Sequence, residues 1–212
     1  MEDSNRMTLE DRVNGFLAAL DSLGDFGRSL KEDDKFINFL TKNGFFTAPA
    51  STKYHGNYEG GLYDHSYQVY KRLLELTINN GLQWQRPESP FIIGMFHDLC
   101  KIDQYVFVED FEALSVKEYN DTITGKKKRS GHYEYNTNTL LKGHGIKSVM
   151  LLSQFINLTE EEMLCIRFHM GAYGNEEEQK VEWASLDTAI KKYPNVFWSH
   201  CSDMIASKLD GT

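Results

Sequence analysis

Cysteine, proline and long apolar runs are all scarce in this sequence. Its 212 residues include only three cysteines, Cys100, Cys165 and Cys201, which lie far apart and form no Cys-x-x-Cys pair. This argues against a disulfide framework and a zinc knuckle, and it is typical of the reducing cytoplasm, where we expect the protein. No apolar stretch is long enough to span a membrane, and the polar start MEDSNRMTLEDRVN is unlike a signal peptide. We therefore expect no membrane partner.

Positive charge is scarce as well. The net charge of −8 argues against a basic surface that coats nucleic acid. One dense basic run does occur, formed by Lys126, Lys127, Lys128 and Arg129. Charge runs usually lie in water, which favours a solvated hairpin tip. The alternative is a flap that adds positive potential over a phosphate-rich substrate.

Long amphipathic runs dominate the chain, and with only four prolines they predict a mainly α fold. The patterns predict helices over residues 8–24, 32–45, 62–78, 145–157, 159–171 and 194–209, and one that starts at Ser89 and Pro90. Thr159 and Glu162 form a capping box. Residues 104–136 carry β-branched and aromatic side chains and predict a β-hairpin insertion. We expect one globular unit, in which an N-terminal helical segment (1–50) packs on a main domain (51–212).

Most polar side chains at unexpected positions are histidines. His65 lies in the stripe formed with Leu62, Val69, Leu73 and Leu76, which has the spacing of a buried helix face. A lone histidine there is more often a hydrogen-bonded core residue than a metal ligand.

His97 and Asp98 end the apolar helix that begins SPFIIGMF. Adjacent helical residues point about 100° apart, so both can bind one ion only near a helix end, where this pair lies. A buried carboxylate needs a partner or a metal, and imidazole with carboxylate suits several divalent ions. The alternative is an ordinary polar helix terminus at the surface.

Three further residues fit a metal site. His144 lies just ahead of a helix, His169 ends the apolar helix MLCIRFHMG, and Asp203 lies inside the apolar helix WSHCSDMIAS. Each has a simpler interpretation: a helix start, a partner of a helix dipole, and a core ion pair. Together with His65 and the His97–Asp98 pair, they favour a shared metal site.

The order of GGLYDHS, FHDLCK, GHGIKS, RFHMG and SDMIAS resembles the H…HD…H…H…D pattern of the HD-domain metal-dependent phosphohydrolase superfamily. The resemblance covers about residues 55–209 and implies an HD-domain helical bundle over 51–212. It is greatest to small stand-alone HD hydrolases of bacteria and phages and to the HD domains of bacterial exoribonucleases. No five-strand oligonucleotide-binding module precedes the domain, so we do not favour a nucleic acid end as the substrate.

The resemblance also implies roles for individual residues. His65, His97, Asp98 and Asp203 match the ligands of a first metal ion, and His144 and His169 match the extra histidines of the binuclear branch. Asp98 matches the bridging carboxylate. Some binuclear relatives have a further histidine where this chain has Met170, so a second ion would be bound more weakly or completed by water. Cys100 matches no ligand, and we interpret it as a small buried spacer.

The implied activity is hydrolysis of a phosphate ester, of a nucleotide or a similar small molecule, by water that a divalent metal activates. Asp98 and Lys101 are the candidate catalytic residues, because Lys101 matches the lysine of the HDxxK motif near the substrate phosphate. One or two ions are expected, and Fe, Mn, Ni, Co, Zn and Mg are not distinguished. The alternatives are a di-iron oxygenase of the same superfamily and a nucleotide-binding regulator without turnover. The oligomeric state stays open.

Further substrate contacts are expected from basic side chains near these motifs. His55 lies in the glycine–tyrosine loop YHGNYEGG, and loops carry functional residues more often than their share. Arg167 lies two residues before His169, where an ion pair is the more common role. His132 follows the basic run and is more typical of an exposed histidine. The candidate substrate-binding residues are Lys101, His55, Arg167, Lys127, Lys128, Arg129 and His132.

Overall fold

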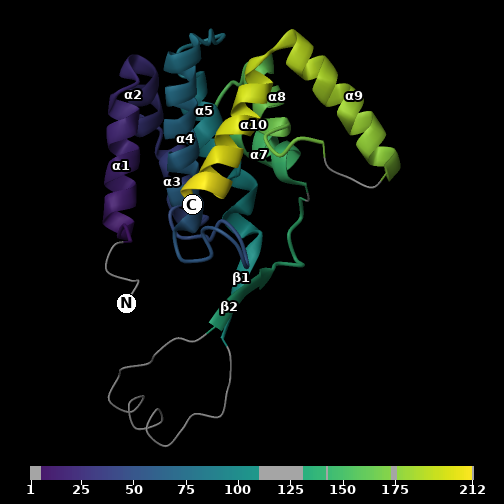
Figure 1. The fold of residues 1–212 in the computed structure, drawn as a ribbon. Coiled ribbons are helices and arrows are strands. Elements are labelled where there is room, and N and C mark those ends of the chain that lie inside the picture. Colours follow the sequence, from purple (N-terminus) through teal and green to yellow (C-terminus); the bar gives the residue numbers. More distant parts are fainter. Residues whose placement is uncertain (1–5, 110–130, 142, 173–175, 212) are drawn as a thin grey trace, which may run out of the picture.

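The computed structural model describes residues 6–109, 131–141, 143–172 and 176–211, and it is mainly helical with one β-hairpin (Figure 1). This confirms the expected fold class. The described helices are α1 (Leu9–Asp21), α2 (Gly24–Glu32), α3 (Asp34–Lys42), α4 (Gly61–Asn80), α5 (Ser89–Phe96), α7 (His144–Leu152), α8 (Glu160–Arg167), α9 (Glu176–Lys192) and α10 (Asn195–Ile205). Among them, none is long and apolar enough to cross a membrane.

The hairpin consists of β1 (Tyr105–Glu109) and β2 (Gly131–Tyr135), which pair antiparallel with Tyr105 opposite Tyr135. It lies where the sequence predicts an insertion over 104–136, and Figure 1 shows it leading away from the helices. The basic run, Lys126, Lys127, Lys128 and Arg129, lies outside the described residues. Two irregular turns complete the described elements: the 3-10 helix η2 (Leu99–Asp103) and the π-helical turn η3 (Ala206–Asp210).

The N-terminal helices share one hydrophobic core with the rest of the molecule. The ring of Phe16 in α1 lies 6.2 Å from that of Phe96 in α5, and the ring of Phe36 in α3 lies 5.7 Å from it, between centroids. A buried ion pair adds to this contact, because Arg12 Nε donates to Asp64 Oδ1 at 2.7 Å. The described part of the N-terminal segment, residues 6–50, thus packs against the rest of the molecule, and the division into two parts at residue 50 stays a prediction.

Several helix boundaries differ from those expected. Instead of one helix over 8–24, α1 ends at Asp21 and α2 starts at Gly24, where a φ of +61° breaks the helical run. α8 ends at Arg167, so His169 lies two residues beyond it. The helix over 194–209 gives way at Ala206 to η3.

α9 was not expected, because its sequence shows little amphipathic pattern. Val181 and Trp183 are exposed, while only Leu186 and Ala189 of its described side chains are buried apolar residues. Figure 1 shows α9 leading away from the body of the molecule. This helix therefore has few neighbours against which it could bury apolar side chains.

Candidate metal centre

His97 and Asp98 lie at a corner of the backbone. α5 ends at Phe96, and the His97 N–H still donates to the Ile93 carbonyl at 2.9 Å. At Asp98 the backbone leaves α-helical geometry (φ −103°, ψ 19°) and continues as η2. Because of this change the two adjacent side chains face the same point: His97 Nε2 lies 3.4 Å from Asp98 Oδ2. Both residues are buried, which confirms the expected position at the end of an apolar helix.

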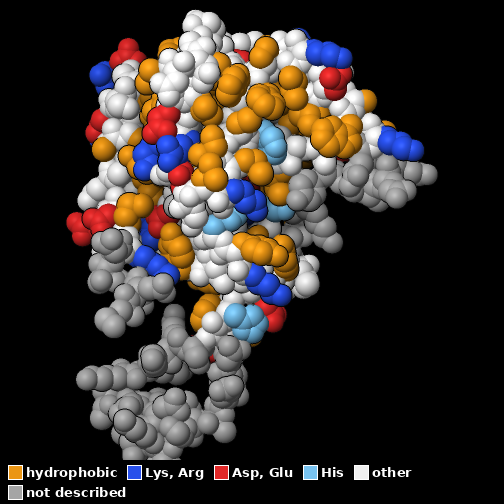
Figure 2. All heavy atoms as spheres, viewed as in Figure 1, with side chains coloured by type: hydrophobic (Ala, Val, Ile, Leu, Met, Phe, Trp, Pro, Cys, Tyr) orange, Lys and Arg blue, Asp and Glu red, His pale blue; other side chains and the backbone are white. Residues whose placement is uncertain are grey.

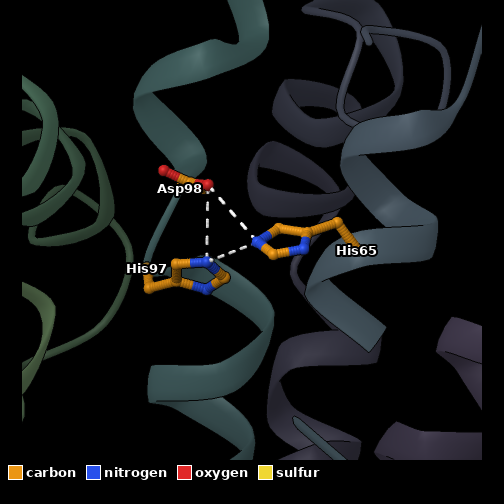
Figure 3. A group of neighbouring side chains, drawn as sticks. All are labelled: His65, His97 and Asp98. Atoms are coloured by element: carbon orange, nitrogen blue, oxygen red, sulfur yellow. Dashed lines mark hydrogen bonds and ion pairs between the residues drawn. The ribbon is translucent and has the colours of Figure 1, made fainter. Parts of the chain in front are cut away.

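His65 reaches the same point from α4 (Figure 3). Its Nε2 lies 3.2 Å from His97 Nε2 and 3.6 Å from Asp98 Oδ2, and the side chain is 1% exposed. α4 and α5 can approach this closely because Gly94 has no side chain: a Cβ there would lie 2.4 Å from the Tyr70 Cα. His65, on the buried face of α4, therefore lies next to His97 and Asp98 at the end of α5.

Asp203 and His169 close the cluster from two further segments. Asp203 in α10 places Oδ1 3.2 Å from His65 Nε2 and 4.0 Å from His97 Nε2. His169, beyond α8, places Nε2 3.3 Å from Asp98 Oδ1. Five of the side chains expected at a metal site therefore meet in the interior, although the sequence separates them by up to 138 positions (203 − 65).

Two backbone carbonyls fix which nitrogen of each ring carries the proton. His97 Nδ1 donates to the Gly94 carbonyl at 2.9 Å, and His169 Nδ1 donates to the Ile166 carbonyl at 2.8 Å. A carbonyl only accepts, so the proton of each neutral ring lies on Nδ1 and the Nε2 lone pair faces the cluster. Histidines that ligate metals are oriented in this way. His200 supports the arrangement, since its Nδ1 donates to the His169 carbonyl at 2.6 Å.

Two buried polar atoms in the cluster lack a hydrogen-bond partner. They are Asp98 Oδ1 and His169 Nε2, which face each other at 3.3 Å without the geometry of a hydrogen bond. An unsatisfied buried group costs about 1–3 kcal/mol, so a folded protein rarely keeps two side by side. A cation that both atoms ligate would remove this cost.

The charges of the cluster keep its carboxylates ionised. Burial alone would raise the pKa of Asp98, but the charge of Lys101, followed by the nearby His97, outweighs it and holds that pKa well below its usual range. Burial would likewise raise the pKa of Asp203, and the hydrogen bond with His65 holds it below its usual range. Lys101 Nζ lies 2.7 Å from Asp98 Oδ2, and this carboxylate raises the pKa of Lys101 although burial opposes it.

His144, the first residue of α7, lies on another side of Asp98 together with Cys100. Cys100 Sγ is 3.6 Å from His144 Nδ1, and Cys100, His144 and Asp98 each offer a potential ligand atom, all within 4.8 Å of one another. Burial, followed by the charge of Asp98, raises the pKa of Cys100 to about 12. Burial also lowers the pKa of His144. The sequence alone did not predict that Cys100 lies next to His144. Only its position in HDLCK, two residues after Asp98, could have indicated that it lies near the cluster.

Part of the cluster reaches the surface. The Asp203 side chain is 15% exposed, and His144 and His55 are both partly exposed. In Figure 2, histidine and basic side chains come to the surface in the middle of the face shown. The His55 ring lies 5.3 Å from that of His65, and burial, with the nearby His65 and Lys101, lowers the pKa of His55 to about 4. His55 is therefore neutral at pH 7 and lies beside the cluster, as a substrate contact requires.

The remaining candidate residues lie apart from the cluster. Arg167 forms an ion pair with Glu182 of α9 at 2.6 Å, which is the more common role expected for it. His132 lies on β2, half-exposed, with Nε2 2.9 Å from Glu134 Oε1. Any contact of these two residues with a substrate stays a prediction, as does that of the basic run.

The residues present fit a divalent metal ion. Buried imidazole nitrogens with inward lone pairs and ionised carboxylates are the donor set of first-row ions, and the two orphaned atoms would both be satisfied by one. Three groups of side chains in the described part of the chain could hold an ion: His65–His97–Asp98, His97–His169–Asp203 and Asp98–Cys100–His144. The buried His/Asp site that the sequence predicts is therefore present.

Comparisons of the chain with protein-family models, with curated proteins and with solved structures find no match.

Proposed function

We propose that the protein is a metal-dependent phosphohydrolase of the HD type, which cleaves a phosphate ester of a nucleotide or a similar small molecule. One observation carries the proposal: the H…HD…H…H…D residues, spread from His65 to Asp203, meet around one buried carboxylate. A chance resemblance in sequence order would not require these side chains to meet in space.

The chain's own residues divide into two ligand groups around Asp98. His65, His97, Asp98 and Asp203 would hold a first ion, since Asp98 Oδ2 and Asp203 Oδ1 both lie close to the His65 nitrogen. Asp98 Oδ1 faces His169, which also groups with His97 and Asp203, and this oxygen would be available to a second ion. Such ions supply Lewis acidity, which acidifies water and polarises a phosphoryl oxygen.

Lys101 supplies positive charge beside this carboxylate. Lys101 is buried, and Asp98 holds its ammonium, so the side chain is fixed in place before a substrate arrives. A preorganised charge of this kind stabilises the negative charge that gathers on phosphoryl oxygens in the transition state. His55, neutral and half-buried next to His65, would contribute a hydrogen bond rather than a charge.

The test is metal analysis of protein purified without added metal, followed by a screen of nucleotides, phosphomonoesters and phosphodiesters with the metal found. We expect a bound divalent ion and release of phosphate or of a phosphomonoester. An iron pair that consumes O₂ without hydrolysis would replace the proposal with the di-iron oxygenase. Tight nucleotide binding without turnover on any substrate would replace it with the regulator.

A further inference from the structure

The structure places a thiol at the centre, where the HD pattern has no ligand. Cys100 Sγ lies 3.6 Å from His144 Nδ1, and with one oxygen of Asp98 these atoms form a group whose members lie within 4.8 Å of one another. Thiolate, imidazole and carboxylate are three of the ligand types found in protein zinc sites. Ligand atoms within 4.8 Å of one another lie close enough to bind one cation.

Asp98 also has an oxygen without a hydrogen-bond partner. Oδ1 is buried and faces His169 Nε2 at 3.3 Å, while Oδ2 faces His65, His97 and Lys101. The side chain as a whole is 3% exposed. One oxygen of Asp98 therefore faces the first ligand group, and the other stays unsatisfied unless a cation binds beside it.

The backbone holds Cys100 and His144 in this arrangement. The Cys100 N–H donates to Ser148 Oγ at 3.0 Å, which ties η2 to α7. α7 in turn packs directly on the end of α8, because a Cβ at Gly145 would lie 2.3 Å from the Arg167 carbonyl oxygen. Both potential ligands thus lie on short segments that cannot separate easily, as a metal site requires.

We propose that Cys100, together with His144 and Asp98, ligates a second metal ion, and that the sulfur makes this position selective for zinc or cobalt over magnesium. This inference rests on the proposed function, and it adds Cys100 to the residues that would ligate the second metal ion. On binding, the metal–sulfur bond replaces the S–H bond and the proton leaves to solvent. Soft sulfur ligands favour zinc and cobalt over magnesium, which prefers oxygen.

The test is a titration of metal-free protein, prepared with a chelator, with Co²⁺. Thiolate ligation gives an intense sulfur-to-cobalt charge-transfer band in the near ultraviolet, which nitrogen and oxygen ligands do not produce. We expect this band in the wild-type protein and its loss in Cys100→Ser. The second equivalent of Co²⁺ should bind at least about tenfold more weakly to the variant, since even an outer-sphere partner contributes that much to a metal site.

Cys165→Ser is the matched control. Cys165 is also fully buried, but it belongs to none of the candidate metal groups among the described residues, so its variant should keep the band. X-ray absorption of the wild-type zinc protein needs no variant and covers the case in which Cys100→Ser does not fold. We expect a sulfur neighbour at about 2.3 Å in addition to nitrogen and oxygen at about 2.0–2.1 Å.

The outcomes separate this inference from the proposed function. Cobalt that binds with its visible bands but without the charge-transfer band would overturn the role of Cys100 and leave the His/Asp site intact. The role of Cys100 is equally overturned if the band persists in Cys100→Ser or if the zinc protein shows no sulfur neighbour. Failure of the wild-type protein to bind Co²⁺ or Zn²⁺ would overturn the role of Cys100, and failure to bind any divalent ion would overturn the proposed function as well.

Discussion

At the scale of single residues, Asp98 is the centre of the site because its two oxygens face different partners. Oδ2 lies 2.7 Å from Lys101 Nζ and 3.4 Å from His97 Nε2, whereas Oδ1 faces His169 at 3.3 Å. A side chain of the same shape without the charge would keep the packing and lose both the attraction for a cation and the partner of Lys101. A substitution by a side chain of the same shape can therefore test the role of the Asp98 charge separately from the role of its packing.

Asp98→Asn tests this separation. We expect loss of bound metal and a fall of at least about 100-fold in phosphohydrolase activity, comparable with removal of a preorganised charge-stabilising group elsewhere. Metal analysis and initial rates measure the two effects. Asp25→Asn removes a carboxylate that is 96% exposed on α2 and should leave both unchanged. A metal-free Asp98→Asn protein with full activity would show that the mechanism is wrong.

Gly94 sets the distance between α4 and α5. A Cβ there would lie 2.4 Å from the Tyr70 Cα, and backbone atoms cannot move aside as a flexible side chain can. We expect Gly94→Ala to lower the free energy of unfolding by about 1–3 kcal/mol, the usual cost of overpacking. Metal affinity should also fall, because His97 Nδ1 donates to the Gly94 carbonyl.

Urea unfolding and a metal titration measure these two effects for Gly94→Ala. The comparison is Gly15→Ala, within α1, where an added Cβ meets only the Tyr63 hydroxyl, at 2.9 Å. This variant should lose less stability and bind metal as the wild type does. Equal losses in the two variants would contradict a specific role for the approach of α4 and α5 at Gly94.

The grouping of the six candidate residues could be predicted because His65 and Asp203 are polar residues in apolar helices, while the others were singled out by their helix-end positions and by the resemblance. Cys100 could not be predicted in the same way. Cysteine is common in protein interiors, so a buried thiol raises no suspicion by itself. Its position next to His144 depends on how η2 turns after Asp98 and on how closely α7 packs at Gly145, and neither is visible in sequence.

At the scale of elements, the start of α8 is fixed by a buried carboxylate. Glu162 closes the capping box with Thr159, as the sequence predicts, and it also accepts hydrogen bonds from Ser89 Oγ at 2.8 Å and from Arg86 Nε at 2.7 Å. Glu162 is 0% exposed. One side chain therefore joins the first turn of α8 to the first turn of α5, the two helices whose ends carry His169 and His97.

Glu162→Ala should lower the free energy of unfolding by about 3–5 kcal/mol, because it leaves buried donors without their acceptor. Denaturant unfolding measures the loss. Glu160→Ala, in the same turn of α8, removes an exposed carboxylate that pairs with Lys192 and should change stability little. If the two variants lose the same stability, the contact between the starts of α5 and α8 is unimportant.

η3 is held to α4 by Asp210. Its carboxylate accepts hydrogen bonds from Arg72 Nε and Gln68 Nε2, both at 2.7 Å, and these bonds lower its pKa to about 2. A lowered pKa stabilises the fold above the unfolded value of about 3.9, and this contribution is lost as the pH falls through about 2. Asp210→Asn cannot ionise and lacks this contribution at every pH.

We therefore expect the Tm difference between the wild type and Asp210→Asn to be constant from pH 7 to about 5 and to shrink between about pH 4 and 2. Thermal unfolding followed by circular dichroism at a series of pH values measures it. Glu75→Gln, which removes another partner of Arg72 that is 56% exposed, is the comparison and should give a smaller difference. A difference that grows on acidification would contradict the expected sign.

The elements could be predicted from sequence where the buried face is wide, as in α4, α5 and α8. The two unpredicted helices have narrow buried faces. In α2 only Gly27 and Leu30 are buried, and α9 has exposed Val181 and Trp183 on a helix that leads away from the core. A helix that buries little apolar surface carries a weak periodic signal, so its existence depends on propensity and tertiary contacts that sequence alone does not supply.

At the scale of the whole molecule, the candidate centre joins segments that are remote in sequence. Its ligands come from α4, the α5–η2 corner, the start of α7, the segment after α8, and α10. These residues meet only after the core has formed, since an unfolded chain would have to close loops of many residues to bring them together. Binding of a metal ion here would therefore be coupled to folding, and an ion that binds the folded form alone would stabilise the entire domain.

Removal of the metal should consequently lower the global stability of the protein. At a free Zn²⁺ concentration about 100 times the dissociation constant, binding adds about 2.7 kcal/mol to the free energy of unfolding, and chelation removes it. Thermal unfolding with and without a chelator, across a range of Zn²⁺ concentrations, measures the shift in Tm. Asp98→Asn protein is the control and should show no shift, because it cannot bind the ion. A chelator that leaves the Tm of zinc-loaded wild-type protein unchanged would mean that the cluster of histidines and carboxylates binds no metal in the folded state.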